Sequence, residues 1–412
     1  MQAARRAVIV GGSMSGLLAA ALLGRIGWDV DVFERSTVEL VGRGAGITAH
    51  PELLDVLELS GAGTRGLGVE VDRRIAIDER GRVIAERPLR QILTSWDRLQ
   101  RLLRDREPDG RYHLGHTFVS AEQDARGVTV RFAEGRVERA DLLVGGDGFR
   151  SSVRAQVAPD SQPVYAGYVV WRGAPDEASL SAATRASIVP YFTFFLPERQ
   201  QVIGYPIAGL NNELRPGRRR YNFIWYRVVP EDRLRDMCPD AEGRHHEFSI
   251  APPLIRDDII AEMRATAQTT MAPPFLDVLR RIARPFFTPI YDLVSPRMVF
   301  GRTVLIGDAA SVARPHMGYG VSKAAEDARV LAEALAARPD DIDGALAEFE
   351  ARRLPVGERV VRHAQMLGTH LGVGVRTEQD RLTSKALQDP NAMLRHIAVP
   401  HFLDAPLPGR EA

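Results

Sequence analysis

The sequence predicts an α/β protein with a Rossmann-like nucleotide-binding domain, a second domain built on an antiparallel β-sheet, and a helical C-terminal region. Three observations support this fold class. A strand–turn–helix–strand pattern with a glycine-rich turn occupies residues 7–34, aromatic strands follow between residues 165 and 227, and helical periodicity dominates from residue 322 onward. A chain of 412 residues is long enough to divide these elements among two or three subdomains.

The opening pattern reads as one βαβ unit. Residues 7–10 form a short β-rich run, residues 11–16 a glycine-rich turn, and residues 17–26 an apolar helix of the kind that is buried against a sheet. Gly27 suits the position after a helix end, and residues 29–34 predict the second strand. Apolar residues run almost continuously through both strands, which is typical of a parallel sheet covered on both faces.

The elements expected further along the chain follow from the same periodicities and from turn residues. In the first half they are helices at 51–59 and 96–104, strands through the 70s and 80s, a hairpin at 128–140 and a strand at 142–144. In the second half they are strands at 165–173, 191–196, 201–207, 221–227 and 299–306, and helices at 253–267, 274–283, 322–337, 342–354 and 356–371. The tail from Pro400 is rich in Pro and Gly and is expected to lie over the surface.

Composition and charge exclude several classes of protein. The chain has 54 Lys and Arg against 53 Asp and Glu, so no electrostatic argument favours nucleic acid or an anionic membrane as a partner. Its single cysteine, Cys238, rules out an intrachain disulfide and a thiolate metal cluster, and it fits a cytoplasmic location. Apolar stretches fall short of the ~18 residues of a membrane span. No metal site is expected, because the histidines lack an accompanying set of carboxylates and thiols.

The first chemical motif is Gly11-x-Ser13-x-x-Gly16, with Glu34 eighteen residues after the last glycine. Gly11 permits a tight turn after the strand, a small residue at Ser13 lets the backbone approach a pyrophosphate, and Gly16 lets helix and strand pack closely. The helix N-terminus then faces the phosphates, and the Glu34 carboxylate would accept hydrogen bonds from a ribose. The alternative is a turn in some other α/β protein. Two flanking residues are also expected to contact the dinucleotide: Ser15 and Arg35.

Two further strands end in aspartate turns far along the chain. Residues 142–144 run into Gly145-Gly146-Asp147-Gly148, and residues 304–306 run into Gly307-Asp308. The second turn continues through residues 314–320 into a helix that carries Asp327. A single Gly-Asp turn does not by itself indicate a function. Two such turns, each after an apolar strand and both following an N-terminal dinucleotide fold, indicate a shared binding site.

With these three motifs in this order, the chain resembles the FAD-dependent aromatic hydroxylases, the single-component family related to para-hydroxybenzoate hydroxylase. The resemblance implies that Asp308 binds the ribityl chain or ribose of FAD, and that Asp147 serves FAD or NAD(P)H. It also implies that a loop lines the isoalloxazine ring and that the following helix start lies near the flavin N1–C2=O region. The residues concerned are Pro315, Gly318, Gly320 and Val321. Residues 165–173, 204–207, 222–226 and 314–316 resemble the branch that contains bacterial dihydroxypyridine hydroxylase.

The resemblance divides the chain into a Rossmann-like FAD-binding domain and a substrate domain. The expected FAD-binding parts are residues 1–72, 93–160 and 291–372, the last with helices, and the expected substrate-domain parts are residues 73–92 and 161–290. Residues 373–412 are expected to form a C-terminal helix and tail.

The chain departs from the family pattern at two places. Trp96 stands where many members carry an arginine that reaches the FAD phosphates, which puts that contact in doubt. Ser322 and Lys323 stand near the position of the usual asparagine after the Gly-x-Gly. Arg43, in a glycine-rich loop, matches a family arginine that contacts the flavin or its pyrophosphate, and its alternative is a solvated loop arginine.

The resemblance also implies a reaction. FAD is bound non-covalently and reduced by NADH or NADPH, which binds only transiently because the chain has one dinucleotide fold. Reduced flavin and O2 form a C4a-hydroperoxide that hydroxylates a small, electron-rich aromatic or heteroaromatic ring of pyridinol or phenol type. A homodimer is the family default.

Three residues are candidates for contact with the substrate. Tyr205, bracketed by Gly204 and Pro206 at a strand end, is expected to line the pocket. His316, in the loop expected to face the flavin, could move a substrate proton, but a structural role in that loop is equally compatible. His50 is a weaker candidate for the same proton transfer.

Other functions remain compatible with these motifs. A flavin oxidase or a halogenase-like enzyme would need the same flavin site, although the tryptophan-rich signature of tryptophan halogenases is absent. A non-catalytic flavin-binding protein would bind FAD without substrate-stimulated NAD(P)H oxidation. Stoichiometric peroxide without a hydroxylated product would identify an oxidase.

Overall fold

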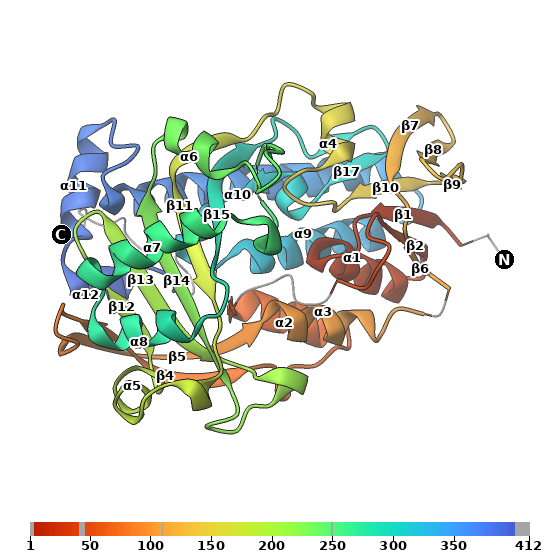
Figure 1. Cartoon of the computed structure of the whole chain (residues 1–412). Helices are drawn as coiled ribbons and strands as arrows, with labels where there is room; N and C mark the ends of the chain where they lie inside the picture. Colours follow the sequence, from red (N-terminus) through yellow and green to blue (C-terminus); the bar gives the residue numbers. More distant parts are fainter. Residues whose placement is uncertain (1–3, 41–45, 109, 249, 400–412) are drawn as a thin grey trace.

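The computed structural model describes residues 4–40, 46–108, 110–248 and 250–399. Two large β-sheets lie side by side, one in a parallel α/β unit that contains the N-terminal strands and one made mainly of long antiparallel strands (Figure 1). This arrangement confirms the predicted fold class. Within the described ranges, no helix is both long enough and apolar enough to cross a membrane.

The parallel unit is built on a six-stranded sheet with strand order β16-β17-β10-β1-β2-β6. Its strands are β1 (Arg6–Val10), β2 (Asp29–Glu34), β6 (Tyr112–Leu114), β10 (Leu142–Gly145), β16 (Val299–Phe300) and β17 (Thr303–Leu305). β1 pairs in parallel with both β2 and β10, so the strands before the glycine turn and the Asp-Gly turn end side by side. β10 pairs in parallel with β17, which brings the Gly-Asp turn to the same edge.

Helix α1 (Met14–Arg25) joins β1 to β2 and packs against α9 (Gly320–Ala337). It begins at Met14, one turn before residue 17, where the sequence predicted its start. The reason is the backbone of Gly11, whose φ of +106° turns the chain so sharply that Ser13 already occupies the N-cap position. Apolar side chains cover α1 on nearly every side because the helix lies between the sheet and other helices.

The second sheet has nine strands in the order β18-β15-β11-β14-β13-β12-β4-β5-β3. They are β3 (Gly46–Ala49), β4 (Val69–Ile77), β5 (Val83–Ser95), β11 (Val164–Gly173), β12 (Phe192–Phe195), β13 (Gln200–Ile207), β14 (Arg220–Val228), β15 (Phe286–Val294) and β18 (Ser311–Val312). All neighbours are antiparallel except β12 and β4, which are parallel. The early strands β4 and β5 therefore extend the aromatic sheet formed by residues 164–294.

Both faces of the nine-stranded sheet are buried, and the side chains alternate between them. Trp171 belongs to the apolar cluster that includes residues of α7 and α8, whereas Val170 belongs to the cluster on the other face, with residues of α10 and α12. The helices on the first face are α5 (Ala182–Ile188), α6 (Glu231–Met237), α7 (Asp257–Thr270) and α8 (Pro273–Arg281). The second face looks towards the loop and helices that follow the Gly-Asp turn.

The remaining elements connect or cover these sheets. They are α2 (Pro51–Leu59), α3 (Trp96–Arg104), α4 (Ser152–Val157), the small sheet β7 (Phe118–Asp124), β8 (Gly127–Phe132) and β9 (Val137–Ala140), and the C-terminal helices α10 (Ile342–Gly368), α11 (Glu378–Ala386) and α12 (Pro390–His396). Arg43 and the tail from Pro400 lie outside the described residues.

Two sequence expectations are corrected. The predicted break at Pro355 does not occur, because α10 runs through the proline from Ile342 to Gly368. Packing of α10 against α9 and β15 overrides a local penalty of about 3 kcal/mol for an interior proline. The predicted single strand at 299–306 is instead a β16–β17 hairpin, because Gly301 adopts φ +64° and turns the chain.

Candidate active site

The N-terminal glycine turn is held by very close backbone packing. A Cβ at Gly16 would lie 1.8 Å from the Gly11 carbonyl oxygen, and one at Gly11 would lie 2.5 Å from the Gly146 carbonyl oxygen. Only glycine fits such approaches, so the turn brings the amide end of α1 beside the Asp-Gly turn. This is the geometry that a pyrophosphate requires at a helix N-terminus.

Glu34, at the end of β2, stabilises this turn through hydrogen bonds. Its buried carboxylate accepts hydrogen bonds from the Gly12 amide and the Ser36 amide, both at 2.9 Å. The Tyr112 hydroxyl donates to the Gly12 carbonyl at 2.9 Å. Glu34 also lines the adjoining cavity, so the ribose contact expected for it stays a prediction compatible with its position.

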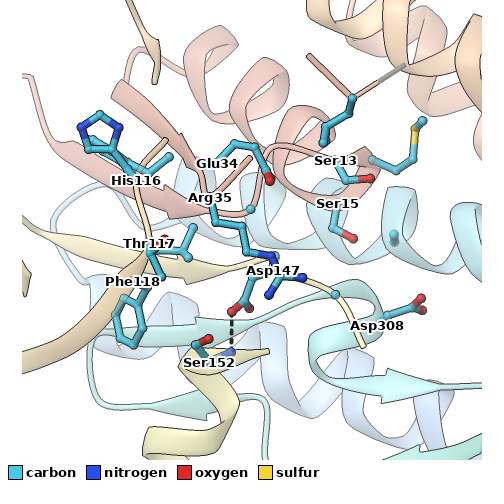
Figure 2. A pocket seen from close by; sticks show the side chains of 18 of the residues that line it. Ser13, Ser15, Glu34, Arg35, His116, Thr117, Phe118, Asp147, Ser152 and Asp308 are labelled. Carbon is cyan, nitrogen blue, oxygen red and sulfur yellow. Dashed lines mark hydrogen bonds between the residues drawn. The ribbon is translucent and has the colours of Figure 1, made fainter. Parts of the chain in front are cut away.

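Three motifs far apart in the sequence enclose one cavity of about 380 Å³ (Figure 2). The predicted cofactor residues among its lining are Gly11, Ser13, Ser15, Glu34, Arg35, Asp147, Asp308, Gly320 and Val321. Figure 2 shows Arg35 extending across the cavity towards Asp147. Trp96 also lines this cavity. Arg35 is the arginine among the described lining residues of this cavity.

The carboxylate of Asp147 accepts its hydrogen bonds from residues just after its own turn. The Ser151 hydroxyl donates to one carboxylate oxygen at 2.5 Å, and the Ser152 amide, in the first turn of α4, donates to the other at 2.7 Å. Burial raises the pKa of the Asp147 carboxyl group. Arg154, on the same helix, donates to the Ala309 carbonyl at 3.1 Å and ties the Asp-Gly turn to the Gly-Asp turn. A direct cofactor contact for Asp147 stays a prediction.

The Gly-Asp turn rests on a buried charged network. Gly307 adopts φ +60°, its amide donates to Asp327 at 3.0 Å, and its carbonyl accepts from Lys323 Nζ at 2.7 Å. Arg353 donates to the second Asp327 oxygen at 2.8 Å. Asp308 itself faces the cavity, and burial raises the pKa of its carboxyl group. No hydrogen bond reaches this carboxylate from the described residues, so it remains available to a ligand hydroxyl.

The loop after the Gly-Asp turn separates the first cavity from a second one of about 200 Å³. Asp308, Gly320 and Val321 line both cavities, while Pro315 and Gly318 line the second. Gly318 takes φ +59°, a left-handed conformation that favours glycine, and α9 begins at Gly320 immediately afterwards. The positive end of the α9 dipole therefore lies at the junction of the two cavities.

The opposite wall of the second cavity is the nine-stranded sheet. Arg172, Tyr205, Ile224 and Tyr226 contribute side chains from β11, β13 and β14. Tyr205 is only 3% exposed, stacks on Phe192 with 4.8 Å between ring centroids, and has a phenol pKa that burial raises. The structure thus places Tyr205 where the sequence expected a pocket residue, with its hydroxyl protonated near neutral pH.

His316 lies behind the loop instead of in the cavity wall. It is completely buried, its ring stacks on Tyr226 at 4.7 Å, and His370 meets it edge-on at 5.3 Å. Its Nε2 is 2.9 Å from the Tyr168 hydroxyl and its Nδ1 is 3.2 Å from Gln201 Oε1. Burial lowers the pKa of the ring well below the ordinary value. This geometry argues against the expected role as a base for the substrate and favours the structural alternative.

His50 is likewise a structural contact in the described geometry. It is 2% exposed, it precedes α2, and its Nε2 lies 3.0 Å from the Met317 carbonyl oxygen. It holds the loop at Met317 from the side of α2, as His316 holds it from the side of the sheet. Neither histidine is among the lining residues of the two cavities.

A third cavity of about 370 Å³ adjoins the first two. It shares Arg35, Asp147 and Asp308 with the first cavity, and Arg172 and Pro315 with the second. The rings of Phe149, Phe248 and Tyr291 form an aromatic cluster on its wall, with centroid distances of 5.2–5.7 Å.

Sequence reasoning missed several lining residues. His116, Thr117 and Phe118 line the first cavity from the start of β7, but they carry no motif and reach the cavity only through the fold. Arg172 had a usable signal, because it is a charge placed among aromatic and β-branched strand residues. Within the described part of the chain, no group of three or more His, Cys, Asp or Glu side chains is arranged to hold a metal ion.

The site fits FAD. The glycine turn and helix N-terminus suit a pyrophosphate, Glu34 and Asp308 offer carboxylates to ribose and ribityl hydroxyls, and the α9 start faces the position of the ring system. The fold and site thus define a flavoprotein of the FAD-dependent oxidoreductase class.

The comparisons with known proteins give the family. A family model described as FAD binding domain-like matches residues 165–292. The 2,6-dihydroxypyridine 3-monooxygenase of Paenarthrobacter nicotinovorans is 33% identical over 371 residues, covering 90% of this chain and 92% of that protein. The chain belongs to the FAD-dependent aromatic hydroxylases, in the branch of this relative, and it is a monooxygenase that binds FAD.

Solved structures agree with this placement. The structure of 2,6-dihydroxypyridine-3-hydroxylase from Arthrobacter nicotinovorans matches with a TM-score of 0.84 and 33% identity, covering 91% of this chain and 94% of that one. Klebsiella pneumoniae HpxO, complexed with FAD and uric acid, matches with a TM-score of 0.79 and 25% identity over 99% of both chains. The predicted family, fold class and FAD cofactor are confirmed, and the non-catalytic alternative is set aside.

Proposed function

We propose that this monooxygenase uses NAD(P)H and O2 to hydroxylate a small, electron-rich pyridinol- or phenol-like ring by the C4a-hydroperoxide route. The observation that carries the proposal is the shared wall of Asp308, Gly320 and Val321. These three residues line both the first cavity, which carries the glycine turn, and the second cavity, which is lined by Tyr205 and Tyr226. A flat ring in the second cavity would therefore lie next to the flavin.

FAD, held non-covalently, supplies the redox chemistry and the activation of O2. In this proposal the Gly11–Gly16 turn and the α1 N-terminus hold its pyrophosphate, Glu34 its ribose, and Asp308 its ribityl chain or ribose. The loop from Pro315 to Gly320 would line the ring system, and the start of α9 at Gly320 and Val321 would bring the positive end of the helix dipole to it. Arg35 takes the place of the phosphate-binding arginine that is absent at Trp96.

On the substrate side, this chain's own residues orient the ring and exclude water. Tyr205 stays protonated because burial raises its pKa, so its hydroxyl can donate a hydrogen bond to a ring oxygen. The aromatic faces of Tyr205 and Tyr226 suit a flat ring. His316 and His50 do not contact the substrate in this proposal. They position the loop at residues 315–320 through their hydrogen bonds.

The third cavity is our proposed docking site for NAD(P)H. Arg35 and Arg150 offer positive charge for phosphates, and Phe149 and Tyr291 offer rings for stacking. The cavity shares Asp308 with the flavin site, so a nicotinamide bound there would be close to the flavin.

The balanced net charge of +1 and single cysteine support a cytoplasmic enzyme without nucleic-acid or membrane partners. The homodimer is proposed from the family alone.

The test is NADH and NADPH oxidation by the FAD-loaded protein, with and without 2,6-dihydroxypyridine, followed by mass analysis of the product. We expect stimulated oxidation and a product heavier by one oxygen atom. Unstimulated oxidation would refute the dihydroxypyridine assignment, and the same assay would then be run with other phenols and heteroaromatics. Stoichiometric hydrogen peroxide without a heavier product, for every ring tried, would refute hydroxylation in favour of an oxidase.

A further inference from the structure

Arg172 lies where the second and third cavities meet. It lines both the second and the third cavity, together with Asp308 and Pro315. On β11 it follows the alternation of Tyr168 and Val170, whose side chains belong to the face of the sheet that looks towards the loop. Its side chain therefore projects from the floor of the substrate domain towards the proposed flavin position.

The guanidinium of Arg172 makes no hydrogen bond or ion pair with another described residue. Neighbouring arginines are different: Arg314 pairs with Asp292 at 2.8 Å, and Arg154 donates to the Ala309 carbonyl at 3.1 Å. Arg172 is half-buried. An uncompensated charge in such a place is costly unless an anion completes it.

Two phenol groups in the cavity wall feel this charge. Burial raises the pKa of Tyr205 and raises that of Tyr226 to about 12, and in both cases the positive charge of Arg172 opposes the rise. Arg172, Tyr205 and Tyr226 line the same cavity, so the field of the guanidinium extends over the space beside both rings. An oxyanion placed there would meet a cation and hydrogen-bond donors together.

We infer that Arg172 binds an ionised oxygen of the substrate, either a ring oxyanion or a carboxylate, while Tyr205 and Tyr226 hold the ring. The inference rests on the proposed function and narrows its substrate class to anionic hydroxy-aromatics. Ionisation also enriches the ring in electrons, so a site that selects the anion selects the more reactive form of the substrate. Arg172 is a binding and specificity-determining residue in this assignment.

The test compares Arg172→Gln and Arg172→Lys with the FAD-loaded wild type. Ring binding is followed through the flavin absorption spectrum with 2,6-dihydroxypyridine, 4-hydroxybenzoate and uric acid as probes, and 2,6-dimethoxypyridine as a ligand that cannot form an oxyanion. We expect Arg172→Gln to weaken the best anionic ligand about tenfold to a hundredfold, with unchanged FAD content. The affinity of Arg172→Lys for the anionic ligand should lie between those of the wild type and Arg172→Gln, because lysine keeps the positive charge but lacks the planar guanidinium with its paired donors.

A matched control is available on the same sheet. Arg227, on the neighbouring strand β14, packs over Trp225 on the opposite face, with 4.9 Å from its guanidinium carbon to the ring centroid. Arg227→Gln should leave ligand binding unchanged. In the wild type, the apparent Kd for 2,6-dihydroxypyridine should tighten as the pH rises through the ligand's own pKa, and Arg172→Gln should lose this pH dependence.

The outcomes separate the two proposals. Unchanged anion binding in Arg172→Gln would overturn the Arg172 assignment and leave the hydroxylase intact, and so would equal weakening of the dimethoxy ligand. A variant that loses NADPH binding but keeps ring binding would also overturn it, because Arg172 would then serve the third cavity. If no ring perturbs the wild-type flavin spectrum, the proposed function and the inference built on it fail together. Between the anionic probes, preference for 4-hydroxybenzoate would identify a carboxylate site and preference for 2,6-dihydroxypyridine a ring-oxyanion site.

Discussion

At the scale of single residues, the fold either gives a polar side chain a partner within the chain or leaves it open towards a cavity. His316 and Tyr168 satisfy each other in the core, whereas Arg172 and Asp308 face space that a ligand can fill. The same residue types thus serve stability in one place and binding in another. Burial decides between these uses, because an unpaired polar group in the core costs about 1–3 kcal/mol.

Acid destabilisation is predicted at this scale. Burial lowers the pKa of His363 and of His370 to about 4, so both are neutral in the folded protein near pH 5. In the unfolded chain they take up protons below about pH 6.5, so the unfolded state binds more protons and stability falls as the pH drops from 7 towards 4. Each should lower the unfolding free energy by about 2 kcal/mol at pH 5.

The measurement is the thermal or urea unfolding midpoint at pH 7, 6 and 5. His370→Gln should show a shallower decline than the wild type, whatever its stability at pH 7. His245→Gln, at an exposed position, should keep the wild-type decline. Equal slopes in His370→Gln and the wild type would show that His370 does not titrate in this way.

At the scale of elements, the cofactor site depends on tight turns between strands and helices. Gly11 and Gly307 both adopt left-handed backbone conformations, with φ values of +106° and +60°. These turns lie at the same end of the sheet because β1 and β17 both pair in parallel with β10, which lies between them. The site is therefore a property of a sheet edge, with each element contributing one short segment.

The glycine turn supplies a direct prediction. In Gly16→Ala the new Cβ would lie 1.8 Å from the Gly11 carbonyl oxygen, so the turn must open and lose its fit to the pyrophosphate. We expect the purified variant to retain less than about a tenth of the wild-type FAD, since loss of close backbone approach removes several charge-assisted hydrogen bonds. Flavin absorbance per mole of protein measures this.

Gly24→Ala is the control on the same helix. A Cβ at Gly24 meets no heavy atom within 4 Å, so this change should keep full FAD content and stabilise α1 by about 0.5–1 kcal/mol. Full flavin content in Gly16→Ala would mean that the turn tolerates opening and that the pyrophosphate is held elsewhere.

At the scale of the whole molecule, the C-terminal segment braces the cavity loop from outside. Arg74, completely buried on β4, donates to the carbonyls of Leu394 and Ile397. The Ala398 amide then donates to the His316 carbonyl at 2.9 Å. Residues more than 300 positions apart are thus linked in one chain of contacts from the sheet to the loop.

This linkage predicts the effect of Arg74→Met. The change leaves two carbonyls without donors in the core, so stability should fall by about 3 kcal/mol. Amide exchange in residues 390–399 should become faster, and FAD should dissociate more readily because the loop loses its brace. Hydrogen-exchange mass spectrometry and flavin retention test both effects.

The neighbouring Arg73 provides the control. It is half-exposed, and its contacts are a surface ion pair with Glu86 and a ring contact with Tyr191. Arg73→Met should leave stability nearly unchanged and exchange at 390–399 unaltered, because exposed ion pairs contribute little to stability. Unaltered exchange in Arg74→Met would show that α12 is held by apolar packing alone.

Much of the fold was predictable from the sequence because its signals are local. Helices α2 and α3 begin and end where periodicity and turn residues predicted, at Pro51–Leu59 and Trp96–Arg104. The three motifs that line the first cavity were also identified in order, since each is a short run of glycine and aspartate next to an apolar strand. Periodicity could not predict helix continuity through Pro355, because packing against α9 and β15 maintains it.

By itself, the sequence determined the fold class, the family and the segments that meet at the cofactor site. Only the tertiary structure decided which side chains face that site. It turned His316 into the core between Tyr226 and His370, and it left Arg172 without a partner at the junction of two cavities. The physical reason is that strand, helix and turn signals depend on neighbours in the chain, whereas burial and pairing depend on residues brought together from positions far apart in the sequence.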